Sequence, residues 1–548
     1  MIFRSPHPHV SVPEISFSDF LLGGCRVRGE APAFVDGPTG RVLTFAQLAE
    51  SAESFAAGLT AAGLERGAVV AIFSPNLPEY AVVVIGAIRA GCVVTTINSL
   101  LTAGEIGQQL RDCGAELIVT VPELACRAAE AAEGSQVRDI VVIGDSAGAT
   151  PLARILAAGR GQIEAAGQQQ AVPDPHKDVA VMLYSSGTTG GSKGVLLTHR
   201  NLVANVLQCQ AALPSGQGDT VIAVMPFAHV YGIVVLLSFN IWRGTPVVCF
   251  PRFDLASFLG AVQDHRSRTL YVVPPIVLAL AKHPLVDRFE LAVERIICGA
   301  APLGDDIQQA CSERLGCLIG QGWGMTECGL GAANPLDRPE QVRPGSSGPL
   351  VPGCECKFVD VVTGRELGPC EQGELWLRGP NVMRGYLNRP QETASALVDG
   401  WLRTGDIGYA DPDGWIYVVD RAKELIKYKA FAVAPAELEA LLVTHPAVLD
   451  AAVVPSPDAE SGEVPKAFIV TRAAVDLADL QSWVARQVAP YKRVRRFEVV
   501  SQIPRTPSGK ILRRVLIEQE RAAAGPADTR HRNQRSHRPD TAAGNIGV

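Results

Sequence analysis

Apolar and polar positions follow two different patterns along most of the chain, from Leu43 to about Val470. Segments such as TFAQLAESAESFAAGL have the pattern of an amphipathic helix, whereas AVVAIF, CVVTTI, LIVTV and DIVVIG are short runs rich in β-branched residues. Helical patterns that alternate with such runs are typical of α/β layers with largely parallel sheets. The sequence therefore predicts an α/β fold.

The pattern changes near Arg421, where the strand-like segment GWIYVVDR is followed by the charged segment AKELIKYK. Beyond it, PAELEALLVTHPAVLDAAVVPSPD, PKAFIVTR and LQSWVARQVA predict a small α+β domain. We expect a large N-terminal domain of layered α/β sheets over 1–421, the small domain over 422–520, and a disordered tail over 521–548. The tail is expected to be disordered because it is rich in Arg, His, Ala and Gly without periodicity.

Composition narrows the classes of protein to which the chain can belong. It has 548 residues, and no run of 18 or more apolar residues that would predict a membrane span. The first residues, MIFRSPHPHVSVPE, lack the apolar stretch of a signal peptide, so we expect a cytoplasmic protein. A net charge of −6 gives no general attraction to nucleic acid, and the 13 scattered cysteines are expected to be reduced thiols.

The segment YSSGTTGGSKG, from Tyr184 to Gly194, gathers hydroxyls, glycines and one lysine into a single turn after an apolar run. Backbone N–H groups of such a loop can surround phosphate oxygens, with hydroxyl donors and the charge of Lys193 beside them. The segment is not a Walker A loop, because Ser192 precedes the lysine and Gly194 follows it. Taken alone, it is as compatible with an ordinary flexible loop as with a phosphate site.

Three further segments follow this loop along the chain: GWGMTE at 322–327, WLRTGDIGYADPDGWIYVVDR at 401–421 and PRTPSGKILRR at 504–514. With YSSGTTGGSKG, they resemble the adenine and Mg²⁺ motif, the ribose motif, the catalytic-lysine motif and the phosphate loop of the adenylate-forming superfamily. That superfamily contains acyl-CoA synthetases, adenylation domains and luciferases, and the resemblance covers about residues 30 to 518. Within the superfamily, the chain looks most like the 4-coumarate:CoA ligase and aryl- or long-chain acyl-CoA ligase branch. The segments that carry this likeness are MPFAHVYG, CGAAPL, KELIKYKAFAVAPAELE and VAPYKRVRR.

The resemblance implies an ATP site distributed over several segments. Trp323 would lie flat against adenine, and Asp406 and Arg421 would bind the ribose. The residues implied for the nucleotide are Ser185, Ser186, Gly187, Thr188, Thr189, Lys193, Gly299, Ala300, Ala301, Pro302, Gly322, Trp323, Gly324, Met325, Asp406 and Arg421. The structural alternatives are a buried core tryptophan at 323 and an ordinary turn at the TGD segment.

The resemblance also implies the residues that act on the phosphates. Thr326 and Glu327 would meet phosphate and Mg²⁺, since a hard cation takes oxygen ligands. Lys510, on a mobile C-terminal domain, would bridge the α-phosphate and the substrate carboxylate in the transition state. The implied reaction converts an acid and ATP into acyl-AMP and pyrophosphate, and then transfers the acyl group to coenzyme A. Positioning and charge stabilisation would supply most of its rate.

The acid itself is only partly legible in the sequence. The residues that the resemblance implies for its pocket are Tyr231, Gly232, Gly299, Gly322, Gly329, Gly331, Ala332 and Ala333. The small residues among them would leave volume, and no Lys or Arg offers itself to a second carboxylate, so we favour a bulky apolar acid. His229, in PFAHVYG, resembles a gate between the adenylate site and the thiol channel; a structural histidine is the alternative.

The loop KYKAFAVAP departs from the resembling ligases at Ala430, where they have glycine, and at Ala432, where they have glutamine. In those ligases the C-terminal domain turns about a hinge near the residue at Lys423, and the loop, with Lys427 and Phe431, then lines the coenzyme A channel. A Cβ at 430 would narrow this channel or shift the backbone. We expect efficient adenylation but slow thioester formation, unless a slightly moved loop accommodates the methyl group.

Other functions stay open on these residues. An adenylate-only enzyme would pass acyl-AMP to a partner enzyme, and an enzyme that loads a carrier protein should come with a carrier domain, of which the tail shows no sign. A non-catalytic nucleotide sensor would have no need of Lys510, and a luciferase-like oxygenase shares the fold. The sequence decides neither the acid nor the oligomeric state, for which a homodimer stays open.

Overall fold

The computed structural model describes residues 1–166, 172–185, 192–214, 218–421, 424–428, 431–458, 461–472, 474–506 and 509–523. The chain forms two compact units, one of Met1–Glu424 with Arg505–Lys510 and one of Leu425–Pro504 with the chain from Ile511 onward. Layered sheets and helices confirm the predicted α/β fold class. The boundary expected after Arg421 and the disordered tail stay predictions, because residues 422–423 and 524–548 lie outside the described part.

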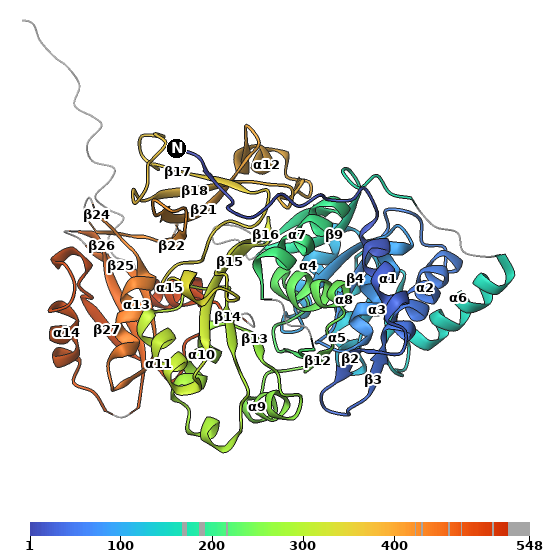
Figure 1. Ribbon diagram of the computed structural model, residues 1–548, viewed down its shortest axis with the longest axis horizontal. Helices are drawn as coiled ribbons and strands as arrows, with labels where there is room; N and C mark the ends of the chain where they lie inside the picture. The colour runs from blue at the N-terminus through green and yellow to red at the C-terminus, as the bar shows by residue number, and fades with distance from the viewer. Residues whose placement is uncertain are drawn as a thin grey trace, which may run out of the picture. The chain divides into compact units, whose positions relative to one another are not determined.

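An eight-stranded sheet is the largest sheet of the first unit (Figure 1). Its order is β19-β10-β9-β5-β4-β6-β7-β8, with bounds β19 Gly385–Tyr386, β10 Lys193–Thr198, β9 Val179–Ser185, β5 Val93–Ile97, β4 Val69–Phe73, β6 Ala115–Thr120, β7 Asp139–Val142 and β8 Thr150–Pro151. The strands from β9 to β8 are parallel, and β10 and β19 add antiparallel pairs at one edge. Every residue of β4 is buried, as expected for a central strand covered on both faces.

Several helices of the first unit begin where a short polar side chain caps them. Their bounds are α1 Phe17–Arg28, α2 Phe45–Ala61, α3 Glu79–Arg89, α4 Ala103–Cys113, α5 Pro122–Ala132, α6 Leu152–Ala166, α7 His199–Ala212, α8 Phe239–Arg243, α9 Leu255–Asp264, α10 Pro274–Lys282, α11 Asp305–Leu315 and α12 Pro390–Ala396. Capping boxes of Thr44 with Gln47 and of Thr102 with Glu105 start α2 and α4. Such a cap contributes about 1 kcal/mol, so these helices start at defined residues.

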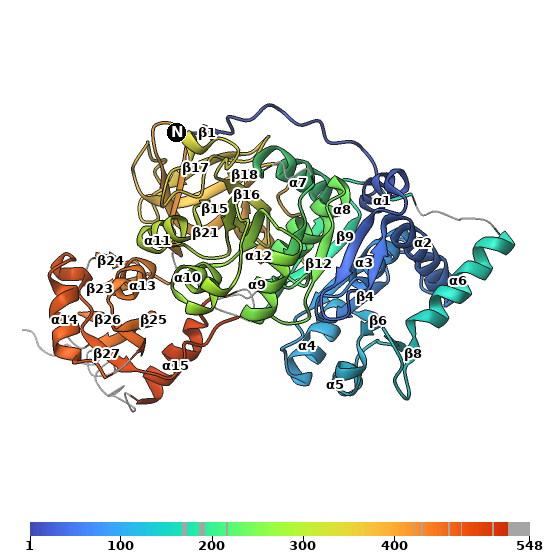
Figure 2. The ribbon, with the colours of Figure 1, turned by 60° about the horizontal axis from the view of Figure 1, so that its bottom comes forward.

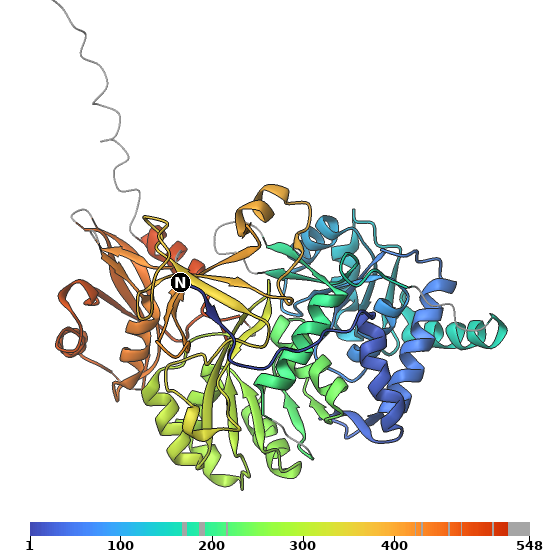
Figure 3. The same ribbon diagram turned by 45° about the horizontal axis from the view of Figure 1, so that its top comes forward.

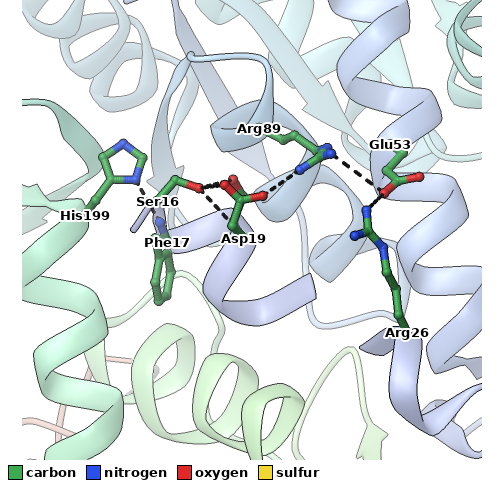
Figure 4. Close-up of polar contacts among 8 residues, drawn as sticks. Ser16, Phe17, Asp19, Arg26, Glu53, Arg89 and His199 are labelled. Carbon is green, nitrogen blue, oxygen red and sulfur yellow. Dashed lines mark hydrogen bonds and ion pairs between the residues drawn. The ribbon is translucent and has the colours of Figure 1, made fainter. Parts of the chain in front are cut away.

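Arg89 is the polar centre of the packing among α1, α2 and α3 (Figure 4). Although the residue is only 8% exposed, its guanidinium lies 2.9 Å from Asp19 and 3.8 Å from Glu53. Arg26 also pairs with Glu53 at 2.5 Å, and the Ser16 hydroxyl donates to Asp19 at 2.5 Å. A buried charge is stable only with such partners, so this cluster holds the three helices in one arrangement.

The first unit also contains two four-stranded sheets. The first has the order β11-β12-β2-β3, formed by Val221–Ala223, Val247–Cys249, Pro32–Asp36 and Val42–Thr44. The second has the order β13-β14-β15-β16, formed by Thr269–Val272, Arg295–Cys298, Leu318–Met325 and Gly329–Ala333. β13, β14 and β15 are parallel, so the loop after β14 and the end of β15 meet at one edge, where ligands of such sheets commonly bind.

A six-stranded antiparallel sheet completes the first unit. Its path is β1-β17-β18-β21-β20 with β22 paired to β21, formed by Phe3–Arg4, Glu355–Val359, Gly373–Arg378, Trp401–Ala410, Leu397–Val398 and Ile416–Arg421. The N-terminal strand β1 pairs with β17, which lies about 350 residues later in the sequence (Figure 3). The β21–β22 pairing sets Asp406 opposite Arg421, which brings two predicted site residues together.

The second unit is a sheet with helices and has its own core (Figure 2). Its strands are β24 Phe431–Val433, β23 Ile426–Tyr428, β26 Gly462–Thr471, β25 Val448–Asp458 and β27 Arg496–Val499, and its helices are α13 Pro435–Thr444, α14 Leu477–Ala485 and α15 Arg513–Ala523. Leu438 and Leu442 of α13 and Leu480 of α14 pack with Val453 and Ile469 of the sheet. The polar outer positions of these helices therefore face away from a continuous apolar core.

Short 3₁₀ and π segments complete the described structure. The π-helix η1 spans Tyr231–Ser238, and the 3₁₀ turns span Pro284–Arg288, Pro339–Gln341 and Pro490–Lys492. Among the described helices, none is long and apolar enough to cross a membrane. The 13 cysteines are free thiols, as expected, and no cluster of three His, Cys, Asp or Glu suited to a metal occurs in the described ranges.

Candidate active site

Residues from distant parts of the chain line one cavity of about 740 Å³ in the first unit. The lining comes from the end of β9 and the start of β10, the loop after β14, the end of β15, β19 with α12, the first half of β21 and the end of β22. The segment 505–510, which belongs to the same unit, adds Thr506 and Lys510. All four motifs that carried the resemblance therefore reach this cavity.

The two ends of the glycine-rich segment lie side by side at the cavity. Ser185 ends β9 and Lys193 begins β10, and the two residues are cross-strand partners. The hydroxyl of Ser192 donates to the carbonyl of Ser185 at 2.8 Å. Ser186, Gly187, Thr188 and Thr189 lie outside the described residues, so their expected role stays a prediction.

Lys193 is held by two residues that sequence reasoning missed. Its ammonium forms an ion pair with Glu392 of α12 and lies 5.0 Å from the centre of the Tyr386 ring. All three residues line the cavity. Both partners come from a segment about 190 residues later, and only the antiparallel pairing of β19 with β10 brings them here.

A buried glutamine forms two hydrogen bonds with the loop after β14. Leu303 donates its N–H to the side chain of Gln321 at 2.8 Å, and the same amide donates back to the Leu303 carbonyl at 3.1 Å. Ala300, which lines the cavity, has a φ of 72°, a conformation that costs a non-glycine residue about 1 kcal/mol or more. Gly299, Ala301 and Pro302 lie in this loop but are not among the residues that line the cavity, and their contact with the nucleotide stays a prediction. Gln321, a polar residue inside an apolar strand, was the missed signal.

Trp323 and Arg421 each contact one carboxylate oxygen of Asp406. The indole N–H of Trp323 donates to Oδ2 at 2.8 Å, and Nε of Arg421 lies 3.1 Å from Oδ1. Asp406 is 4% exposed, and its charge raises the pKa of Arg421. Trp323 is buried at 7% exposure, with its ring over Gly331, rather than among the cavity-lining residues. Its contact with adenine stays a prediction.

Glu327 follows β15 and is oriented by a phenol. Its side chain lines the cavity beside Thr326, and the Tyr386 hydroxyl donates to its Oε1 at 2.9 Å. Burial raises the pKa of Glu327, while the hydrogen bond from Tyr386 lowers it. Gly324 and Met325 line the same wall, and a Cβ at Gly324 would lie 2.2 Å from a carbonyl oxygen of the neighbouring strand.

The donor set around Glu327 fits a divalent cation that brings most of its own ligands. One carboxylate and the nearby Thr326 hydroxyl are hard oxygen donors. Mg²⁺ keeps several waters and takes substrate phosphates as ligands, so it needs no larger protein cluster. These two residues therefore suit the magnesium expected with ATP.

Lys510 reaches the cavity in an unfavourable electrostatic environment. Burial, followed by the positive charge of Arg421, lowers the pKa of its ammonium to about 8. The backbone N–H of Lys510 donates to the Thr506 hydroxyl at 3.0 Å, and its carbonyl accepts from the Thr506 N–H at 2.7 Å, which joins these two residues. An anion bound here would relieve the repulsion between the two cations.

His229 also lines the cavity, on the segment before η1. Burial, with a smaller contribution from the charge of Lys510, lowers the pKa of His229 to about 4. Its Nδ1 accepts a hydrogen bond from the Tyr231 N–H at 3.2 Å, so the ring has a fixed orientation. His229 is therefore neutral at pH 7.

The space beside several small residues of the expected acid pocket is filled by protein atoms. A Cβ at Gly331 would lie 2.4 Å from the Trp323 ring, and one at Gly329 would lie 2.0 Å from the Asn205 side chain. A Cβ at Gly232 would likewise lie 1.9 Å from the backbone carbonyl oxygen of Pro226. The inference that Gly329 and Gly331 leave volume is therefore wrong, because close packing uses that space.

Gly299 lies beside Gly322 and Tyr231, and the role of these three residues in an acid pocket stays a prediction. A Cβ on Gly299 would lie 3.5 Å from the Gly322 carbonyl and 3.6 Å from the Tyr231 ring, which are ordinary contacts. The Tyr231 hydroxyl donates to the carbonyl of Ile297 at 3.3 Å. Ala332 is fully buried in β16. A modest side chain is thus sterically acceptable at position 299 but not at 331.

The residues expected at the coenzyme A channel belong to the second unit. Lys427 is exposed on β23, and its backbone N–H donates to Glu463 at 2.8 Å. Phe431 and Ala432 lie on β24, paired with β23. Ala430 lies outside the described residues, so its proposed effect rests on the sequence alone.

Comparison with known proteins agrees with this geometry. The model of the AMP-binding enzyme family matches residues 24–387, and that of the AMP-binding enzyme C-terminal domain matches residues 437–510. The chain belongs to the AMP-binding enzyme family. The resemblance to adenylate-forming enzymes is thereby confirmed, and so is the prediction of an enzyme of the acid–thiol ligase class.

Relatives match over nearly the full length of this AMP-binding enzyme. Peroxisomal OPC-8:0-CoA ligase 1 of Arabidopsis thaliana is 38% identical over 94% of this chain and 95% of its own. The 4-coumarate–CoA ligase of Pinus taeda is 39% identical over 94% and 97%. The crystal structure of the anthranilate CoA ligase AuaEII with anthranoyl-AMP has a TM-score of 0.85 at 27% identity, covering 94% of this chain and 99% of that one.

Proposed function

We propose that this AMP-binding enzyme activates a bulky hydrophobic carboxylic acid as its acyl-AMP and then forms the coenzyme A thioester. The observation that carries the proposal is the approach of Lys193, Arg421 and Lys510 to one cavity that also contains Glu327. Several cations and hydroxyl donors around a single space suit a polyphosphate better than a neutral ligand. The AuaEII complex supports the same chemistry, since its own ligand is an acyl-adenylate.

In the first step, a carboxylate oxygen of the acid attacks the α-phosphorus of ATP, and the bond to pyrophosphate breaks. Lys193 and the hydroxyls near it would hold the leaving pyrophosphate. Lys510 would stabilise the charge that develops between the acid and the α-phosphate. With a pKa of about 8, most of its ammonium is protonated at pH 7, so charge stabilisation needs no proton transfer.

The nucleotide would be oriented by residues that are already fixed. Asp406 has one oxygen on Trp323 and the other beside Arg421, and its remaining lone pairs would accept from the ribose hydroxyls. Thr326 and Glu327 would hold Mg²⁺, which neutralises phosphate charge when it is bound. The chain therefore binds and orients ATP with little reorganisation.

In the second step, the thiolate of coenzyme A attacks the acyl carbon and AMP leaves. His229 would gate the approach of the thiol, and its low pKa of about 4 keeps the gate uncharged at pH 7. A neutral ring adds no positive charge next to Lys510. This role is separable from adenylation, because pyrophosphate leaves before the thiol is needed.

The acid is proposed to be apolar because the cations at the cavity are engaged elsewhere. Arg403 pairs with Glu374 at 3.1 Å, and Arg421 pairs with Asp406. Lys193 and Lys510 are assigned to phosphate and to the reacting carboxylate. A second carboxylate on the substrate would therefore have to displace an existing ion pair, at a cost of several-fold in affinity or more.

A second candidate is favoured by one sequence difference, Ala430 in place of the glycine of resembling ligases. In this version the enzyme forms acyl-AMP well and passes it to a partner enzyme. Replacing Ala430→Gly should raise acyl-CoA formation at least several-fold and leave adenylation nearly unchanged. Efficient acyl-CoA formation by the natural chain would exclude this candidate.

The proposed function is tested by a panel of carboxylic acids in a pyrophosphate-release assay, with mass analysis for acyl-AMP and acyl-CoA. Apolar aromatic and fatty acids should give both products, whereas amino acids and dicarboxylic acids should give little of either. Binding of ATP without release of pyrophosphate with any acid would favour a sensor instead. The cytoplasmic location stays a prediction, since the name of one relative places that protein in the peroxisome.

A further inference from the structure

The short segment from β19 to α12 brings a carboxylate to the lysine of the phosphate loop. Glu392, in the first turn of α12, has one carboxylate oxygen on Lys193 and the other 3.6 Å from Arg389. Lys193 and Glu392 are 29% and 41% exposed, and both line the cavity. The ion pair therefore lies where a phosphate would approach.

The position of Glu392 is fixed by contacts on both sides of it. The backbone N–H of Tyr386 donates to the Thr393 hydroxyl at 2.9 Å, which joins β19 to α12. Arg389 reaches Asp112 at 3.4 Å, so the helix is also tied to α4. The carboxylate is thus delivered to Lys193 by a held helix turn rather than by a freely moving surface chain.

Tyr386 is the second partner of the Lys193 ammonium. The Lys193 nitrogen lies 5.0 Å from the ring centre, a distance at which a cation is attracted to the ring face. The phenol hydroxyl of Tyr386 donates to Glu327 at 2.9 Å, so the ring itself is oriented. Lys193 therefore has a carboxylate and an aromatic face of the protein as partners.

A polyphosphate at this place must compete with Glu392. Lys193 cannot give its full charge to a phosphate while it is paired with a carboxylate. After the α-phosphate bond breaks, the same competition favours departure of pyrophosphate. The pair is partly exposed, so we expect an effect of a few-fold rather than of several orders of magnitude.

We propose that Glu392 is a positioning residue of the phosphate site, which competes with phosphate for Lys193 and thereby weakens the retention of pyrophosphate. The inference rests on the proposed function, in which Lys193 holds the leaving pyrophosphate. It makes Glu392 a residue that tunes product release and nucleotide affinity. It assigns no bond-making step to the carboxylate.

The decisive variant is Glu392→Gln, which keeps the size of the side chain and removes its charge. Calorimetric titration of the full chain with pyrophosphate, at one fixed concentration of Mg²⁺, should give a dissociation constant about 3- to 10-fold lower than that of the natural chain. Product inhibition by pyrophosphate should become stronger by a similar factor. An unchanged or weaker affinity would overturn the proposal.

A double-mutant cycle tests whether the effect acts through Lys193. In a Lys193→Ala background, Glu392→Gln should change the affinity for pyrophosphate by less than about twofold, since the competing partner is gone. The same tightening in that background would mean simple charge repulsion and would also overturn the proposal. Glu392→Ala, tested beside Glu392→Gln, should give the same result if the charge alone matters.

Glu374→Gln is the matched control, because Glu374 also lines the cavity but pairs with Arg403 at 3.1 Å. It should tighten pyrophosphate much less than Glu392→Gln does; equal tightening would reduce the proposal to a general charge effect. Acid-dependent exchange between ATP and pyrophosphate distinguishes a failure of the proposed function from a failure of the proposed role of Glu392. Its absence in the natural chain contradicts the proposed function, whereas its presence with no effect of Glu392→Gln contradicts only this inference.

Discussion

Lys193 and Lys510 reach the same cavity, but the protein surrounds their ammonium groups differently. Lys193 has the carboxylate of Glu392 and the ring of Tyr386 as partners. Lys510 is buried near the guanidinium of Arg421, and its pKa falls to about 8. Lys193 thus has a close carboxylate partner, whereas at Lys510 burial and the charge of Arg421 outweigh the opposing effect of Asp406, Glu424 and Glu327 on its pKa.

The difference teaches how one cavity can bind a polyphosphate and still release part of it. A balanced lysine gives up its partner when phosphate binds, so it binds phosphate less tightly than an unpaired lysine would and releases pyrophosphate more readily. A lysine near another cation gains most when negative charge develops beside it, which is the condition for transition-state stabilisation. We therefore expect Lys510 to affect the rate and Lys193 to affect binding.

The largest expected effect separates the two lysines directly. Lys510→Ala should lower acid-dependent exchange between ATP and pyrophosphate by about 10²- to 10³-fold, because a transition-state cation is lost. Reaction of pre-made acyl-AMP with coenzyme A should be much less affected. Lys492→Ala removes a partly buried lysine of the second unit that is paired with Glu437, and it serves as the control. Exchange that survives Lys510→Ala within a few-fold would contradict the assignment.

Asp406→Ala should weaken use of ATP by about 10- to 100-fold, since hydrogen bonds to a charged group contribute about 1.5–3 kcal/mol each. It also leaves Arg421 without its partner near Lys510. The order of preference among acids should stay the same, measured as KM for ATP and kcat with each acid. A changed preference with an unchanged KM for ATP would move Asp406 to the acid pocket.

The pH dependence should report Lys510. Its pKa is lowered to about 8, so the ammonium is present below that value and is lost as pH rises through it. The kcat/KM for ATP should therefore fall above about pH 8, by up to about tenfold per unit. Lys510→Arg keeps its charge at these pH values, so that decline should disappear. An identical decline in the arginine variant would assign it to another group.

The smallest expected effect concerns the indole that fixes Asp406. Trp323→Phe removes the donor of a 2.8 Å hydrogen bond and should raise KM for ATP by about fivefold, with little change in kcat. Trp376→Phe is the matched control, because its indole also donates to a carboxylate, that of Glu374, at 3.0 Å. Equal shifts in both variants would mean that Trp323 has no special part in nucleotide binding.

The resemblance of four motifs to one enzyme family implied that they would share an ATP site. Ser185, Lys193, Thr326, Glu327 and Lys510 all line the cavity. Their roles with ligands stay predictions. The α/β class was equally legible, since buried parallel strands read as unbroken apolar runs.

Residues fixed by distant packing could not be predicted in this way. Tyr386 and Glu392 reach Lys193 only through the pairing of β19 with β10, which no local pattern announces. The volume inferred at Gly331 failed for the same reason, because the ring that fills it comes from the opposite strand of the hairpin. Side-chain size in a sequence shows what a residue leaves free only when its neighbours are known.

The most direct test of the account is exchange of labelled pyrophosphate into ATP by the full chain, without coenzyme A, with and without an apolar aromatic or fatty acid. The account predicts exchange that depends on the acid, is lost in Lys510→Ala and persists in Lys193→Ala with a raised KM for ATP. The division of roles would be contradicted if both variants lowered the exchange rate by the same factor and neither raised the KM for ATP. No exchange with any acid in the panel would contradict acid activation itself.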